Sequence, residues 1–354
     1  MKQTDDVRIV ATKELIAPNH IHEQFPLSET AAATTVKGRK DIESVLSGED
    51  DRLVVVVGPC SIHDVDAALE YATGLAQLKK ELSDELVILM RVYFEKPRTT
   101  VGWKGLINDP GLDNSFSVNK GLGIARKLLL SINELGVPAG CEYLDLITPQ
   151  YTGDTVSWGA IGARTTESQC HRELASGLSC PVGFKNGTNG NLKIAVDAIG
   201  AASHAHHFLS VTKEGRTAIV NSTGNEFTHI ILRGGSQAPN YSAEHVEETS
   251  KILHSAGLKS NIMIDFSHAN SQKNPSNQHL VCDDVCAQLE AGERRIFGVM
   301  IESNLVEGKQ QVVTGQPLVY GQSITDACIS WLDTQLLCRN LANAVRSRRM
   351  RPSV

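Results

Sequence analysis

Four cations lie within or just after a short apolar run in the segment 86–105, LVILMRVYFEKPRTTVGWKG: Arg91, Lys96, Arg98 and Lys104. Residues 86–90 are uninterrupted branched or long apolar side chains, which is typical of a strand buried on both faces of a parallel sheet. Arginine binds phosphate and carboxylate through paired donors, and lysine adds a point charge. The segment therefore predicts a strand that carries cations to a small, multiply charged anion. A solvated basic loop after an ordinary strand is the alternative for this stretch alone.

The overall composition narrows the classes of partner. The chain has 354 residues, of which 41% are hydrophobic and 21% charged, enough for one large domain or two ordinary ones. A formal net charge of -6 argues against a general binder of nucleic acid or of a membrane surface. The aliphatic run 53–57 is too short to span a bilayer, and residues 1–10 lack the apolar core of a signal peptide. We expect a cytoplasmic protein whose eight cysteines are reduced.

Short apolar runs alternate with helical patterns along the chain. Nine runs predict strands over 53–57, 86–90, 137–143, 158–163, 180–184, 206–211, 229–232, 262–266 and 296–301. Helical spacing predicts helices over 64–82, 121–135, 243–255 and 282–291. The run 206–211 is followed after one turn by a second run, 218–220, which predicts a hairpin, because a parallel crossover needs about a dozen residues or more.

Eight strands remain when the hairpin is set aside as an insertion. Eight strands alternating with helices predict a (β/α)8 TIM barrel. A doubly wound open sheet is the alternative, but the chain has no glycine-rich phosphate loop that would favour it. Residues 1–50 are polar, with one short helical pattern near 41–46, and we expect an N-terminal arm that packs on the main domain or on a neighbouring subunit. Residues 51–354 then form the barrel, with the hairpin inserted at about 206–223.

Each predicted barrel strand ends at or just before a residue of a functional type. These residues are Cys60, Arg91, Glu142, Arg164, Lys185, Arg233, His268 and Glu302. In a TIM barrel the carboxyl ends of the strands meet on one face, and that face carries the active site. A buried thiol or a rim ion pair would explain any one of them, but their recurrence at all eight ends favours a common site.

Two kinds of chemistry can be separated within this set. Arg91, Arg164, Lys185 and Arg233, together with Lys96, suit a ligand that carries both a phosphate and a carboxylate, such as phosphoenolpyruvate. Cys60, His268 and Glu302, with an acid such as Asp326, offer sulfur, nitrogen and oxygen ligands to one divalent metal ion, without specifying Mn, Fe, Co or Zn. A metal there would polarise a carbonyl for attack by an enol. Arg98, Thr99 and Thr100 could bind the phosphate of a phosphorylated aldehyde. The four arginines within 346–351 predict a solvated basic helix end.

Several motifs together carry a family resemblance. They are GPCSIH at 58–63, RVYFEKPRTTVGWKG at 91–105, GARTTES at 162–168, GFKNG at 183–187, ILRGG at 231–235, DFSHAN at 265–270 and MIESN at 300–304. Through them the chain resembles the class I 3-deoxy-D-arabino-heptulosonate 7-phosphate (DAHP) synthases over nearly its whole length. The resemblance implies condensation of phosphoenolpyruvate with erythrose 4-phosphate, the first step of the shikimate pathway. It also implies a (β/α)8 barrel with an N-terminal extension and an inserted hairpin, assembled as a homotetramer or dimer.

The resemblance further implies roles for individual residues. The metal ligands would be Cys60, His268, Glu302 and Asp326. Phosphoenolpyruvate would contact Arg91, Lys96, Glu142, Ala163, Arg164, Lys185 and Arg233. Erythrose 4-phosphate would contact Arg98, Thr99 and Asp326. Lys96, His268 and Cys60 are the candidate catalytic residues, and His268 or a metal-bound water would move protons.

Feedback inhibition is also implied by the resemblance, which is strongest to the phenylalanine-sensitive form. An aromatic amino acid, phenylalanine, would bind between the arm, the loop after the third strand and the hairpin. The corresponding residues are Asp5, Asp6, Ile9, Pro149, Gln150, Leu178, Ser179, Phe208 and Val220. An arm that serves only assembly is the alternative for residues 1–50. For the whole chain, two alternatives stay open. One is a catalytically silent barrel that senses an aromatic amino acid, and the other is a synthase for another phosphorylated aldose.

Overall fold

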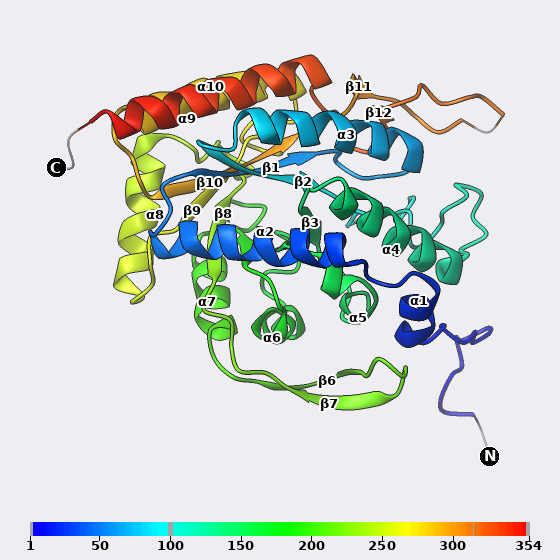
Figure 1. The fold of residues 1–354 in the computed structure, drawn as a ribbon. Helices are drawn as coiled ribbons and strands as arrows, with labels where there is room; N and C mark the ends of the chain where they lie inside the picture. The colour runs from blue at the N-terminus through cyan, green and yellow to red at the C-terminus, as the bar shows by residue number, and fades with distance from the viewer. Residues whose placement is uncertain (1–2, 98–101, 314, 352–354) are drawn as a thin grey trace.

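Eight parallel strands close into a barrel in a computed structural model that describes residues 3–97, 102–313 and 315–351. The barrel strands are β1 Leu53–Gly58, β2 Leu86–Arg91, β3 Ala139–Glu142, β4 Trp158–Ile161, β5 Val182–Lys185, β8 Thr228–Leu232, β9 Ile262–Asp265 and β10 Ile296–Glu302. Their order around the barrel is β1-β10-β9-β8-β5-β4-β3-β2, and every neighbouring pair is parallel. The predicted (β/α)8 barrel is therefore confirmed, and the open sheet is excluded (Figure 1).

The strands are buried on both faces, which explains their unbroken apolar sequences. In β1 alternate residues serve two layers, because successive side chains of a strand point to opposite faces. Val54 and Val56 pack inside the barrel with Trp158, whereas Val55 packs outward with the surrounding helices. All six residues of β1 and all six of β2 are buried. The barrel is thus a filled core, and only its ends offer room for a ligand.

Helices cover the outside of the barrel. They are α3 Val65–Glu81, α4 Val118–Glu134, α5 Pro149–Thr152, α6 Gln169–Gly177, α7 Lys193–Ala202, α8 Ala243–Ser255, α9 Gln278–Glu290 and α10 Trp331–Arg349, with 3-10 turns η1 Gly153–Thr155 and η2 Pro275–Asn277. The Asp64 carboxylate starts α3 by accepting from the backbone N–H groups of Asp66 and Ala67. The predicted helix 243–255 is confirmed to the residue, whereas α9 begins four residues earlier than predicted, since η2 leads directly into it.

The predicted hairpin lies outside the barrel. Strands β6 His207–Val211 and β7 Thr217–Asn221 form an antiparallel pair in which Phe208 faces Val220. In Figure 1 the pair extends below α6 and α7. A second small sheet, β11 Val306–Lys309 with β12 Gln322–Ser323, follows the last barrel strand.

The N-terminal segment contributes more structure than its sequence indicated. After α1 Pro18–Gln24, α2 Glu29–Ser47 is a helix of 19 residues, so the short helix predicted near 41–46 was too short. The reason is that the buried face of α2 begins with Ala31, Thr35 and Gly38, which give no apolar pattern. Its last turns place Ile42, Val45 and Leu46 in the same cluster as the barrel interior. Helix α2 therefore closes the end of the barrel from which the strands start.

The C-terminal helix corrects another expectation. The arginines near its end are not simply solvated: Arg346 pairs with Glu85 at 2.8 Å, Arg349 pairs with Asp51, and Arg348 is buried. Among the described residues, no helix combines the length and the apolar character that crossing a membrane would require.

Candidate active site

One polar cavity of about 190 Å³ opens at the carboxyl ends of the barrel strands. Its lining includes ten of the predicted site residues: Arg91, Lys96, Glu142, Ala163, Arg164, Lys185, Arg233, His268, Glu302 and Asp326. They come from segments far apart in the sequence and meet because the barrel brings its strand ends together. Arg98 and Thr99 lie outside the described residues. The cavity also contacts residues that the sequence did not single out, namely Pro97, Gly162, Thr188, Ser267, Ser271, Lys273, Lys309 and Ala327.

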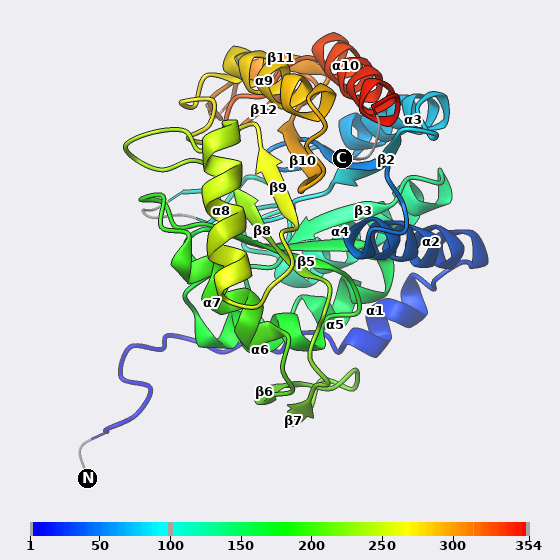
Figure 2. The same ribbon diagram turned by 90° about the vertical axis from the view of Figure 1, so that its left-hand side faces the viewer.

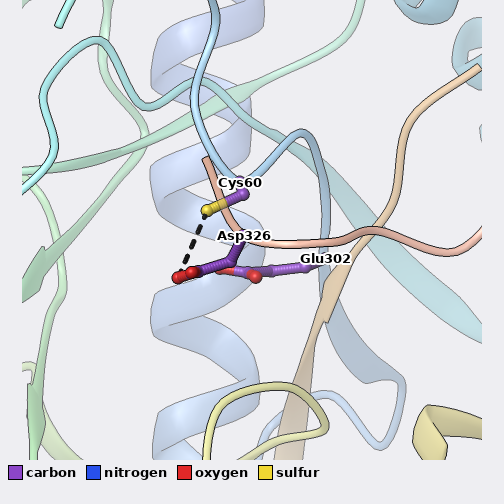
Figure 3. A group of neighbouring side chains, drawn as sticks. All are labelled: Cys60, Glu302 and Asp326. Carbon is purple, nitrogen blue, oxygen red and sulfur yellow. Dashed lines mark hydrogen bonds between the residues drawn. The ribbon is translucent and has the colours of Figure 1, made fainter. Parts of the chain in front are cut away.

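A thiol and two carboxylates lie close together (Figure 3), and the two carboxylates also line this cavity. Cys60, Glu302 and Asp326 each offer one ligand atom, and these atoms lie within 4.8 Å of one another. The first two are neighbours because Gly58 of β1 pairs with Glu302 of β10. Asp326 comes from the loop between β12 and α10. The Lys96 ammonium lies 2.9 Å from Cys60 Sγ and 2.7 Å from Asp326 Oδ2, so a cation already bridges two of the three groups.

The protonation of this cluster follows from burial and charge. Burial raises the pKa of the Cys60 thiol, and the Glu302 charge raises it further. Burial would also raise the pKa of Asp326, but Lys96 outweighs it and lowers the pKa to about 2. A neutral thiol beside two carboxylates becomes a thiolate when a divalent cation compensates its charge. Sulfur and oxygen donors at this spacing therefore fit a borderline divalent metal.

His268 approaches the cluster from β9. Its Nε2 lies 3.8 Å from Glu302 Oε1, although it is not part of the 4.8 Å group. Its Nδ1 lies 2.9 Å from Asp265 Oδ2, and φ is 58°, a backbone conformation that non-glycine residues rarely adopt. Burial lowers the pKa of His268, and the opposing Asp265 charge does not reverse this. A neutral imidazole that donates Nδ1–H to Asp265 leaves the Nε2 lone pair free toward Glu302, as a metal ligand requires.

Asp265 is a site residue that the sequence reading missed. It is fully buried at the last position of β9 and pairs with Lys185 Nζ at 3.0 Å. Burial would raise its pKa, but His268 and Lys185 hold the pKa well below the usual value. The signal was present in DFSHAN, but the residue after the strand end was chosen instead of the last residue in the strand. Gln278 was also missed: its amide bonds both backbone groups of Glu302, at 3.0 and 2.9 Å.

Arg91 forms a buried ion pair with Glu302. Its guanidinium pairs with Glu302 Oε1 at 2.9 Å, donates to the Pro59 carbonyl at 3.0 Å and lies 3.6 Å from the centre of the Tyr93 ring. Burial alone would raise the pKa of Glu302, but Arg91 and His268 lower it. Glu302 is therefore held ionised, in one orientation, at the edge of the cavity.

Two arginines on the opposite side have no such partner. Among the described residues, neither Arg164 nor Arg233 has a carboxylate within 4.0 Å. The Arg233 guanidinium makes one hydrogen bond, to the Gly234 carbonyl at 3.5 Å. Burial lowers the pKa of Arg233. The Asp265 charge opposes this shift without reversing it, and the nearby Arg164 charge adds to it. Two uncompensated guanidinium groups at one cavity wall are suited to a dianion.

The predicted effector residues divide into two groups in this chain. On the barrel side, Phe208 lies close enough to Gly177 for a Cβ there to contact its ring at 3.6 Å, next to Leu178 and Ser179. Hairpin residue Lys213 donates to the Gln150 carbonyl at 2.5 Å, beside Pro149. The arm residues Asp5, Asp6 and Ile9 make local hydrogen bonds, and Ile9 is 58% exposed. Figures 1 and 2 show this end of the chain extending away from the barrel. The complete effector set stays a prediction.

Comparison with known proteins identifies the family. The family model described as DAHP synthetase I family matches residues 24–339. The chain is 64% identical over 347 residues to the Phe-sensitive phospho-2-dehydro-3-deoxyheptonate aldolase of Escherichia coli K12, covering 98% of this chain and 99% of that protein. It is 53% identical over 348 residues to the Trp-sensitive aldolase of Salmonella typhimurium, covering 98% of this chain and 100% of that one.

A solved structure extends the similarity to three dimensions. The phospho-2-dehydro-3-deoxyheptonate aldolase of Francisella tularensis superimposes with a TM-score of 0.94 at 52% identity, over 96% of this chain and 99% of that one. Fold and sequence thus agree, and the chain belongs to the DAHP synthetase I family of enzymes.

Proposed function

We propose that this chain condenses phosphoenolpyruvate with erythrose 4-phosphate to give DAHP and inorganic phosphate, as the first step of aromatic amino acid biosynthesis. The observation that carries the proposal is one cavity lined both by Arg164 and Arg233, which form no ion pair with a described residue, and by Glu302 and Asp326, which lie close to Cys60. One wall is suited to a phosphate, and the other to a metal ion. Family membership at 64% identity to a DAHP synthase supports the same reaction.

Phosphoenolpyruvate would lie across the cavity. Its phosphate needs two free guanidinium groups, which Arg164 and Arg233 supply. Its carboxylate would bind toward Lys185 and Lys96, whose positive charges remain inside the cavity although each also contacts a carboxylate. Ala163 and Glu142 would complete the contacts to this substrate, and Arg98 and Thr99 would hold the phosphate of erythrose 4-phosphate. This arrangement directs the enol carbon toward the thiol and carboxylate cluster.

One divalent metal ion, Mn, Fe, Co or Zn, would be held by Cys60, His268, Glu302 and Asp326. When bound, it would supply a Lewis acid that polarises the erythrose 4-phosphate aldehyde. Burial would lower the pKa of Lys96, but Cys60, Glu302 and Asp326 outweigh it and raise the pKa, so this side chain is protonated at neutral pH. Lys96 would donate to the aldehyde oxygen as the enol carbon forms the new C–C bond. Water then adds to the neighbouring carbon, which carries the phosphate oxygen, and loses a proton. The bond from that carbon to the phosphate oxygen breaks, so phosphate leaves with its bridging oxygen and a ketone remains.

We further propose that phenylalanine inhibits the enzyme at a pocket under the hairpin. The barrel side of that pocket is Pro149, Gln150, Leu178, Ser179, Phe208 and Val220. Because Asp5, Asp6 and Ile9 extend away from their own barrel, a neighbouring subunit of a homotetramer would receive them. The Phe-sensitive relative at 64% identity supports phenylalanine, whereas the Trp-sensitive relative at 53% makes tryptophan the competing effector.

The test is phosphate release from phosphoenolpyruvate plus erythrose 4-phosphate. Turnover should require added metal, stop with chelator, and fall with phenylalanine but not with tyrosine or tryptophan. The variant Arg233→Lys tests the proposed phosphate contact. It keeps the positive charge but loses the paired hydrogen-bond donors, so it should raise KM for phosphoenolpyruvate. Competition with another phosphorylated aldose checks the second substrate. Folded protein that binds phenylalanine but gives no turnover with any metal would refute the synthase and favour a sensor.

A further inference from the structure

Five lysine or arginine side chains are buried among the described residues: Arg91, Arg126, Lys185, Arg233 and Arg348. Three of them form ion pairs: Arg91 with Glu302 at 2.9 Å, Arg126 with Asp154 at 2.7 Å, and Lys185 with Asp265 at 3.0 Å. Arg233 and Arg348 have no carboxylate within 4.0 Å in the part of the chain that the structure describes. A buried charge is costly unless it is paired, so both positions call for an anion. Arg233 lines the proposed substrate site, but Arg348 lies elsewhere.

Arg348 is near the end of α10 and only 5% exposed. Its guanidinium donates to two backbone carbonyls, those of Asp51 and Glu293. These bonds satisfy donors without cancelling the charge. Burial lowers the pKa of Arg348. The charges of Asp51 and Glu293 oppose this shift, and those of Arg294 and Arg349 add to it. The nearby carboxylates therefore do not offset the effect of burial on this guanidinium.

A cavity adjoins this side chain at the end of the barrel where the strands begin. Its lining includes Arg348, Arg294, Lys259, Ser260 and Asn261, together with the end of α2, the loop before β1 and the start of β10. Figure 1 shows the ends of α2 and α10 on the left, at the side of the barrel where β1 begins. The cavity is thus separate from the active-site cavity at the carboxyl ends of the strands.

The two carboxylates that line this cavity form ion pairs with other arginines. Asp50 pairs with Arg52 at 2.6 Å, and Asp51 pairs with Arg349. Arg294 and Lys259 are exposed and form no ion pair with a described residue. Within the described part of the chain, three cations that line this cavity, Arg348, Arg294 and Lys259, therefore form no ion pair. Arg233 and Arg164 show the same pattern at the substrate site.

We propose that Arg348, Arg294 and Lys259 form a second anion site, at the amino-terminal end of the barrel, for a phosphate group that is free or carried by a small monoester. Three positive charges suit a dianion better than a single carboxylate. Asn261 adds a neutral hydrogen-bonding side chain, whose amide already donates to the Leu46 carbonyl at 3.0 Å. A bound phosphate would compensate the buried charge of Arg348 and link α10 to the loops before β9 and β10.

The test is equilibrium dialysis of the full-length protein with labelled inorganic phosphate at constant ionic strength. Binding at both proposed phosphate subsites of the active site is first removed with Arg98→Ala, Arg164→Ala and Arg233→Ala. In that background, we expect saturable binding of about one phosphate per chain. Adding Lys259→Ala and Arg294→Ala should weaken it about tenfold or more, because each charge-assisted contact is worth that much. Both residues are exposed, so folding should be retained and is checked by circular dichroism.

The matched control removes two cations outside the cavity. Lys40→Ala and Lys127→Ala delete exposed lysines that lie in no ion pair with a described residue, and phosphate binding should be unchanged. Competition by glycerol 3-phosphate would assign the site to monoesters, and its failure would assign it to the free ion. The proposal is overturned if the background binds no phosphate, if Lys259→Ala with Arg294→Ala binds as tightly as the background, or if the control weakens binding equally.

Discussion

Replacing Asp265 by asparagine should separate the charge of this residue from its shape. The carboxylate is fully buried and contacts two cationic or ionisable groups, Lys185 Nζ at 3.0 Å and His268 Nδ1 at 2.9 Å. Asp265→Asn leaves Lys185 as an unpaired buried charge. Removing one partner of such a pair costs about 3 to 5 kcal/mol, and we expect about 3 kcal/mol because the amide keeps one accepting oxygen.

The matched double variant tests the cause. Lys185→Met removes the buried charge that Asp265→Asn leaves unpaired. The double variant Asp265→Asn with Lys185→Met should therefore be about 2 kcal/mol more stable than Asp265→Asn alone. Urea unfolding of all four proteins gives this coupling energy. The contribution of Asp265 should be present above its usual pKa of 3.8 and lost as the pH falls below it, since the folded protein holds this pKa well below that value.

The same substitution should affect metal binding. Without the carboxylate charge, the Nδ1–H of His268 loses its strongest acceptor, and its ring orientation and tautomer are held less firmly. Loss of such a partner typically weakens metal binding about 10 to 100-fold. The control is a metal titration of Ser267→Ala, because that variant keeps the carboxylate of Asp265 and its charge. An Asp265→Asn protein that unfolds at the same urea concentration and binds metal equally well would refute this reasoning.

Three further predictions concern other parts of the chain. Burial, with the nearby Asp145 charge, raises the pKa of Glu95 from its usual 4.5 to about 8. The free energy of unfolding should therefore fall as the pH rises between these two values. Urea unfolding at several pH values should show this decrease, and Glu95→Gln should reduce it. Gly38→Ala should lower stability by about 1 to 3 kcal/mol, because a Cβ there would lie 2.6 Å from a neighbouring oxygen. Gly200→Ala, where a Cβ would have no atom within 4 Å, should raise stability by up to about 1 kcal/mol in the same unfolding assay. Cys60→Ser should abolish tight metal binding measured by titration with chelator competition, while serine at the exposed Cys170 should leave it unchanged, and equal affinities would contradict the ligand set.

The sequence by itself determined the barrel and most of its site. Uninterrupted apolar runs such as 53–57 and 86–90 specify strands buried on both faces, because a solvated face would require alternation. The helix 243–255 could be read from its spacing, with Ser242 before it and Gly257 after it. Once eight such strands alternate with helices, the barrel brings their carboxyl ends together, so the residues there could be assigned to one cavity before any distance was known.

Tertiary structure alone decided which side chains are paired. Helix α2 could not be recognised as a barrel cap, since Thr35 and Gly38 become buried only when the barrel lies against them. Arg348 belongs to a basic stretch that reads as solvated, yet packing of α10 buries it, whereas its neighbour Arg349 finds Asp51. Local sequence carries the type and spacing of charges, but their partners come from segments hundreds of residues away. Compensation of a charge depends on those distances, and only the folded chain sets them.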